Sequence, residues 1–168
     1  MLPMVNDAKE ARHILDCLKY VPAGQRGVAL GVAHDGYRGG AVLEKLAAAN
    51  ARTTLYAQIE TRAGVENADA ILSVPGVDAC FIGPNDLAAS MGIGLGVPLE
   101  SDNPALVEAI FEIRDACKRN GVAPGIHTSG AAGANQRIEE GFQFLALASE
   151  LKYMLSGLKD DINQTNWR

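Results

Sequence analysis

Two carboxylates stand where apolar, strand-forming runs give way to helical patterns. Glu60 ends the run 54–60, and Asp86 follows the run 77–82 after a Gly-Pro-Asn turn. In a parallel α/β protein the carboxyl ends of neighbouring strands open into one crevice, so the two acids can face each other. Carboxylate oxygens are the ligands that Mg²⁺ and Mn²⁺ prefer. The spacing therefore predicts a divalent-metal site, although each acid could instead cap the helix that follows it.

The composition restricts the class of protein. A chain of 168 residues, of which 48% are hydrophobic, fits one folded domain that buries about two-thirds of its unfolded surface. The net charge of -5 and the pI near 5.2 argue against a nucleic-acid partner. No apolar run has the length of a membrane span, so no membrane partner is expected. Three dispersed cysteines without a CxxC pair predict reduced thiols and a cytoplasmic location.

Strand and helix patterns alternate along the chain, which predicts a parallel sheet with right-handed crossovers and the α/β class. The expected strands cover residues 2–5, 55–60, 77–82, 122–126 and 142–148. The first expected helix starts after Asn6 or Asp7. Further helices are expected over 41–50, 65–72, 104–120, 131–140 and 151–160. A glycine-rich loop with a polar His34-Asp35 tip spans 20–40. Residues 1–160 are expected to form one domain and 161–168 a C-terminal tail.

Two segments carry a family resemblance: Gln58-Ile59-Glu60-Thr61, and the stretch 81–87 with the sequence FIGPNDL. They resemble the HpcH/HpaI aldolase and citrate lyase family, most closely its 4-hydroxy-2-oxoheptanedioate aldolase branch. Residues 2–5, the loop 22–27 and Pro124-Gly125-Ile126 support the likeness, which runs from Met1 to about Gly157. The resemblance implies a (β/α)8 TIM barrel, of which this chain would cover about strands 4–8 as a partial barrel.

The resemblance also implies a class II, pyruvate-type aldolase. Such an enzyme reversibly cleaves 4-hydroxy-2-oxo acids to pyruvate and an aldehyde. Glu60 and Asp86 would be the metal ligands, for Mg²⁺, Mn²⁺ or Co²⁺. Gln58 would orient the substrate or a water, and the backbone around Gly83 and Asn85 would lie against the pyruvate carboxylate. The partner is then a small α-keto acid, and the assembly a homo-oligomer.

In that family the last helix exchanges between neighbouring subunits. Its apolar stripe here would be Leu151, Met154, Leu155 and Leu158, although the same stripe suits a helix packed on its own barrel.

Part of the family's machinery falls outside this sequence. Met1 aligns near the end of the family's fourth strand, whereas a full barrel takes about 250 residues. The missing region holds the family's general-base histidine and the arginine that binds the enolate oxygen, and neither can be named here. His127 follows the 122–126 strand at the expected catalytic mouth. Three interpretations remain for it: a hydrogen bond to a neighbouring loop, a pocket wall that contacts substrate, or a metal ligand or base.

Other functions remain open or lack support. A lyase acting on citryl- or malyl-CoA thioesters and a non-catalytic truncated member that retains the metal site are the alternatives. The segment 92–96 has the glycine spacing of a phosphate loop but lacks a preceding strand and a following GK[ST]. Ser129 lacks the G-x-S-x-G elbow. Cys80 lies inside a strand and is expected to pack in the core.

Overall fold

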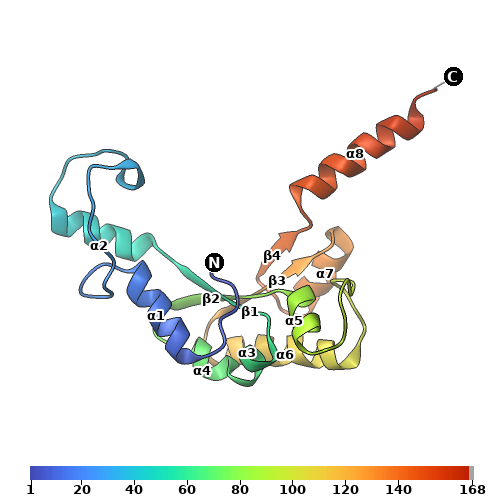
Figure 1. Cartoon of the computed structure of the whole chain (residues 1–168), viewed down its shortest axis with the longest axis horizontal. Coiled ribbons are helices and arrows are strands. Elements are labelled where there is room, and N and C mark those ends of the chain that lie inside the picture. Colours follow the sequence, from blue (N-terminus) through green and yellow to red (C-terminus); the bar gives the residue numbers. More distant parts are fainter. Residues whose placement is uncertain (167–168) are drawn as a thin grey trace.

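The chain is built around one parallel sheet of four strands. The computed structural model describes residues 1–166. In it β1 (Leu55–Ile59), β2 (Val77–Ile82), β3 (Ala123–Thr128) and β4 (Phe144–Leu147) lie in the order β1-β2-β3-β4, each parallel to its neighbour (Figure 1). Strands that follow one another in the chain are therefore neighbours in the sheet. The expected α/β class with a parallel sheet is confirmed.

Eight α-helices and one short 3-10 turn are formed within residues 1–166. They are α1 (Ala8–Leu18), η1 (Ala33–Asp35), α2 (Val42–Arg52), α3 (Arg62–Glu66), α4 (Ala68–Leu72), α5 (Pro84–Ser90), α6 (Pro104–Arg119), α7 (Ala131–Glu139) and α8 (Glu150–Gln164). The starts of α1 and α6 follow their capping residues: the Asp7 carboxylate accepts from the Glu10 N–H at 2.8 Å, and Asn103 caps α6. Gly121 follows α6 with φ of +66°, as the helix-ending glycine pattern predicts.

The helix expected over 65–72 is divided into α3 and α4 at Asn67. The backbone of Asn67 leaves helical geometry at φ -105° and ψ 10°. Its side-chain Nδ2 donates to the Asn6 carbonyl at 2.9 Å and to the Ala63 carbonyl at 3.0 Å. The hydrogen bond to Asn6 ties the α3–α4 junction to the segment that precedes α1. Hydrophobic periodicity along the chain does not reveal such a tertiary contact.

The strand expected over 2–5 is wrong in extent. Only Leu2 forms a β-bridge, parallel to Ala57 of β1, and Val5 N–H donates once more to the Gln58 carbonyl at 3.1 Å. Pro3 has no N–H to add to the ladder, and Met4 adopts a left-handed φ of +58°. This segment follows the β1 edge without becoming a strand.

The two faces of the sheet are buried to different extents. Leu55, Ile59 and Ile82 project from one face and are fully buried, and α4 and α6 pack against that layer of the sheet. Register places Phe81 and Phe144 on the other face, one on each side of Gly125. Their rings lie 5.7 Å apart, but Phe144 remains 36% exposed. One face is a closed core, and the other is an aromatic surface that the described chain covers only in part.

The last helix stands away from this body (Figure 1). Helix α8 runs to Gln164, four residues beyond the helix expected to end at 160, and none of its residues is buried. The proposed boundary at 160 therefore falls inside a helix, and residues 167–168 of the expected tail lie outside the described residues. None of the helices within residues 1–166 combines the length and apolar character that a membrane crossing requires.

Candidate functional site

Glu60 is a buried carboxylate at the carboxyl end of β1. It is 1% exposed, and both of its oxygens are oriented by neighbours. Oε1 accepts from the Met4 backbone N–H at 3.0 Å, and Oε2 accepts from Gln58 Nε2 at 2.6 Å. Gln58 and Glu60 are two residues apart, so β1 places both side chains on the same face. The carboxylate is held in one orientation before any ligand arrives.

The partners of Glu60 do not neutralise its charge. Met4 N–H and the Gln58 amide are neutral donors, and among residues 1–166 no lysine, arginine or histidine forms an ion pair with Glu60. A buried carboxylate is costly unless a cation or several strong donors compensate it. Each oxygen retains a further lone pair. The residues present therefore fit a small oxygen-preferring cation at this point.

Gly83 brings the end of β2 against this carboxylate. A Cβ at Gly83 would lie 2.2 Å from Glu60 Oε2 and 3.3 Å from Gln58 Nε2. Gly83 is also the N-cap position of α5, so Asn85 and Asp86 follow within the first turn of that helix, both exposed. Gln58, Glu60 and Gly83 thus meet at the strand ends, with Asn85 and Asp86 on the adjoining helical turn.

The alternative that Glu60 caps the following helix is wrong. Thr61 caps α3 instead, because its side chain accepts from the Gly64 N–H at 3.0 Å. Asp86 lies in the first turn of α5, where the helix dipole favours a carboxylate. Within residues 1–166 no three histidine, cysteine, aspartate or glutamate side chains form a cluster that could hold a metal. Further positions around a cation here would be filled by solvent or substrate.

His127 forms a hydrogen bond to a neighbouring loop, which is one of the interpretations that the sequence left open. Its Nε2–H donates to the Ala148 carbonyl at 3.0 Å, just past the end of β4. Ala148 has a left-handed φ of +47°, so the hydrogen bond secures a turn that leads from the sheet into α8. The ring is partly exposed. This contact ties together β3 and the segment after β4, and a substrate contact by His127 stays a prediction.

Cys80 is unsuited to nucleophilic chemistry. A hydrogen bond with Cys117, together with burial, raises the pKa of the Cys80 thiol well above its usual range. Both cysteines are fully buried in the core, as expected for Cys80. A neutral, enclosed thiol is a poor nucleophile at neutral pH.

Sequence reasoning missed the contribution of Met4. Its N–H reaches Glu60 across 56 residues of sequence, and a backbone donor has no residue-type signature. The left-handed Met4 conformation is costly for a non-glycine residue. This strained backbone directs the Met4 N–H at the Glu60 carboxylate.

Comparison with known proteins decides the family. The family described as HpcH/HpaI aldolase/citrate lyase matches residues 1–156. The chain belongs to this family. A hydroxypyruvate/pyruvate aldolase of Chromohalobacter salexigens is 34% identical over 164 residues, which are 98% of this chain and 63% of that protein. A 4-hydroxy-2-oxo-heptane-1,7-dioate aldolase of Salmonella typhimurium is 39% identical over 158 residues, or 94% of this chain and 58% of that protein.

Solved members of the HpcH/HpaI family have the same fold over the shared region. An HpcH/HpaI aldolase from Desulfitobacterium hafniense superposes with a TM-score of 0.85 at 31% identity, over 100% of this chain and 65% of that one. A family protein from Burkholderia cenocepacia gives 0.88 at 30% identity, over 98% and 63%. The expected partial TIM barrel is thereby confirmed. The chain spans less than two-thirds of the length of these relatives.

Proposed function

We propose that this chain supplies the metal-binding and keto-acid-binding part of a divalent-metal-dependent, pyruvate-type aldolase. The observation that carries the proposal is the Glu60 carboxylate, which is 1% exposed, oriented by two neutral donors and without an ion-pair partner in residues 1–166. The aldolase names of the relatives from Chromohalobacter and Salmonella support the lyase class. The substrate proposed is a 4-hydroxy-2-oxo acid, cleaved reversibly to pyruvate and an aldehyde.

In this proposal Glu60 and Asp86 hold Mg²⁺, Mn²⁺ or Co²⁺. A bound divalent cation supplies Lewis-acid chemistry, which polarises a keto oxygen and stabilises the negative charge that develops when the adjacent C–C bond breaks. Gln58 keeps the Glu60 carboxylate turned toward the strand ends through its 2.6 Å hydrogen bond. Gly83, which lacks a side chain, leaves space beside that carboxylate for the keto acid. Asn85 offers its backbone and amide next to this space.

The proposed chemistry needs two groups that the described residues do not bring to Glu60. One is a base for the substrate hydroxyl proton, and the other is a cation at the keto oxygen. His127 is engaged with the Ala148 carbonyl. We therefore assign both roles to a part of the barrel beyond this chain.

The Glu60 assignment predicts a large loss of metal affinity in Glu60→Ala. Outer-shell partners of a metal ligand are worth about 10–100-fold in affinity, so removing a ligand should weaken Mn²⁺ binding at least about 100-fold. Titration of Mn²⁺ followed by electron paramagnetic resonance measures this. Glu44→Ala is the matched control, because Glu44 is an exposed acid on α2 and its removal changes the net charge equally. Equal affinity in the wild type and Glu60→Ala would remove Glu60 from the metal site.

We also propose that the protein is a cytoplasmic homo-oligomer assembled through α8. The stripe Leu151, Met154, Leu155 and Leu158 follows helical spacing, and each residue is more than half exposed, from 52% to 64%. The open edge of β4 adds unpaired backbone groups that favour association.

Size-exclusion chromatography with light scattering should therefore give a mass of two or more chains, each of 17.7 kDa. The double variant Leu151→Ser/Leu155→Ser should shift it toward the monomer. Tyr153→Ser, which removes an equally exposed residue outside the stripe, should leave it unchanged. A stable wild-type monomer would refute the assembly proposal.

A further inference from the structure

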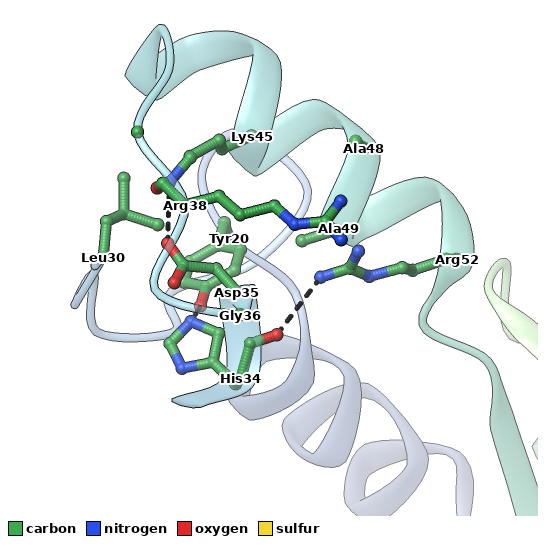
Figure 2. Close-up of a pocket in the computed structure, with 11 residues that line it drawn as sticks. Tyr20, Leu30, His34, Asp35, Gly36, Arg38, Lys45, Ala48, Ala49 and Arg52 are labelled. Atoms are coloured by element: carbon green, nitrogen blue, oxygen red, sulfur yellow. Dashed lines mark hydrogen bonds and ion pairs between the residues drawn. The ribbon is translucent and has the colours of Figure 1, made fainter. Parts of the chain in front are cut away.

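A cavity of about 490 Å³ lies between the glycine-rich loop and α2 (Figure 2). Its lining includes Tyr20, which follows α1, then His34, Asp35 and Arg38 from the loop, and Lys45 and Arg52 from α2. None of these residues belongs to the Glu60 site. Three of the six, Arg38, Lys45 and Arg52, are basic, in a chain whose net charge is -5.

The negative charge of Asp35, the acidic residue in this lining, is balanced by a neighbouring lysine. Asp35 Oδ2 accepts from Lys45 Nζ at 2.8 Å and from the Gly31 N–H at 2.8 Å. These contacts, that from Lys45 foremost, lower the pKa of Asp35 to about 2. Asp35 is therefore ionised at neutral pH, and the Lys45 ammonium balances its charge. Lys45 also donates to the Arg38 carbonyl, which fixes the loop over the helix.

The two arginines remain uncompensated. Figure 2 shows the guanidinium groups of Arg38 and Arg52 approaching each other, one from the loop and one from the helix. Among residues 1–166 neither forms an ion pair with a carboxylate. Arg52 makes a single long contact, 3.5 Å from Nη2 to the His34 carbonyl. Two adjacent positive groups repel, and each presents a planar fork of N–H donors that matches a carboxylate or phosphate.

Asp35 adds a requirement of its own. Its Oδ1 is buried and has no hydrogen-bond partner among the described residues, and a buried acceptor without a donor is unfavourable. Since Asp35 lines the cavity, a ligand with a hydroxyl group can supply the missing donor.

We propose that this cavity binds a small oxyanion, phosphate or carboxylate, that also carries a hydroxyl group. The oxyanion lies between the Arg38 and Arg52 guanidinium groups, and its hydroxyl donates to Asp35. This ligand accounts for the arrangement of the lining, in which Asp35 pairs with Lys45 while Arg38 and Arg52 form no ion pair among the described residues. The cavity shares no residue with the proposed metal site at Glu60 and Asp86.

Isothermal titration calorimetry at constant ionic strength tests the proposal. EDTA is present so that a metal ion at Glu60 and Asp86 cannot contribute to the binding. The probes are inorganic phosphate, glycerate and propionate. We expect one molecule of phosphate or glycerate to bind per chain. The probe that binds more tightly shows whether the site recognises a phosphate or a carboxylate group. Propionate, a carboxylate without a hydroxyl, should bind more weakly than glycerate.

Variants of the arginines locate the site. Arg38→Ala and Arg52→Ala should each weaken binding about tenfold or more, because charge-assisted hydrogen bonds are lost. Arg52→Lys, which keeps the charge but loses the fork, should give an intermediate affinity. Arg12→Ala, an exposed arginine on α1 outside the cavity, is the matched control and should bind as the wild type does. Circular dichroism confirms that each variant is folded. Three results would overturn the proposal: absence of binding by both phosphate and glycerate, undiminished binding by the double variant Arg38→Ala/Arg52→Ala, or propionate binding equal to glycerate.

Discussion

The 168-residue chain by itself is expected to release pyruvate from a 4-hydroxy-2-oxo acid at least about 10⁴-fold more slowly than a completed barrel. General acid–base catalysis contributes about 10²–10⁴-fold, and an oxyanion-stabilising donor about 10²–10³-fold. The Glu60 corner has neither group among its described neighbours, Met4, Gln58 and Gly83. In the proposal the chain binds a metal and a keto acid, and no described neighbour of Glu60 is placed to move the substrate proton.

A fusion tests this expectation directly. The N-terminal remainder of the Chromohalobacter relative, of which this chain matches 63%, can be joined ahead of Met1. Pyruvate release is followed by coupling to lactate dehydrogenase, with Mn²⁺ or Mg²⁺ present. The fusion should be active, and EDTA or Glu60→Ala should silence it. The N-terminal remainder alone serves as the control.

Each other outcome has a specific consequence. Turnover by the bare chain at rates usual for enzymes would show that a residue present here supplies the base, with His127 the first to test. A folded, metal-binding fusion without activity would favour a non-catalytic member of the family that retains the metal site.

Gly83→Ala is expected to weaken Mn²⁺ binding about 10–100-fold, the range for losing the support of a metal ligand. The backbone of Gly83, at φ -98° and ψ 92°, suits alanine. The obstacle is contact, because the new Cβ would lie 2.2 Å from Glu60 Oε2. The carboxylate must move, which breaks its 2.6 Å hydrogen bond with Gln58. We also expect the free energy of unfolding to fall by about 1–3 kcal/mol, as overpacking of a buried site typically causes.

A double-mutant cycle isolates that contact. In a Glu60→Ala background the carboxylate is gone, so Gly83→Ala should have little further effect on the urea midpoint. Gly27→Ala is the matched control, since a Cβ there meets nothing within 4 Å. If Gly83→Ala binds Mn²⁺ like the wild type, the carboxylate beside Gly83 is not a metal ligand.

The sequence by itself determined the elements and their order. Alternating apolar runs predicted β1, β2, β3 and β4. A cap at Asn6 or Asp7, of which the structure has Asp7, and a cap at Asn103 predicted where two helices start. These features depend on neighbours a few residues away in the chain, which is why local patterns reveal them. The motif at 58–61 and 81–87 was sufficient for the family, which the match over residues 1–156 confirms. Strand ends also predicted that Glu60 and Asp86 would face each other, because parallel strands share an edge. The structure brings Gly83 against Glu60, and a position of the Asp86 carboxylate beside Glu60 stays a prediction.

Only the tertiary structure decided what surrounds these residues. Met4 supplies a donor to Glu60 from 56 residues away, and Asn67 breaks a helix by bonding to Asn6 across 61 residues. The cavity that joins Arg38 to Arg52 likewise depends on how the loop folds over α2. Such contacts use backbone groups and long flexible side chains, whose partners are fixed by packing in space and leave no periodicity along the chain. Sequence therefore determined which acid sits at the strand end, and the fold decided that this acid is buried without a counter-charge.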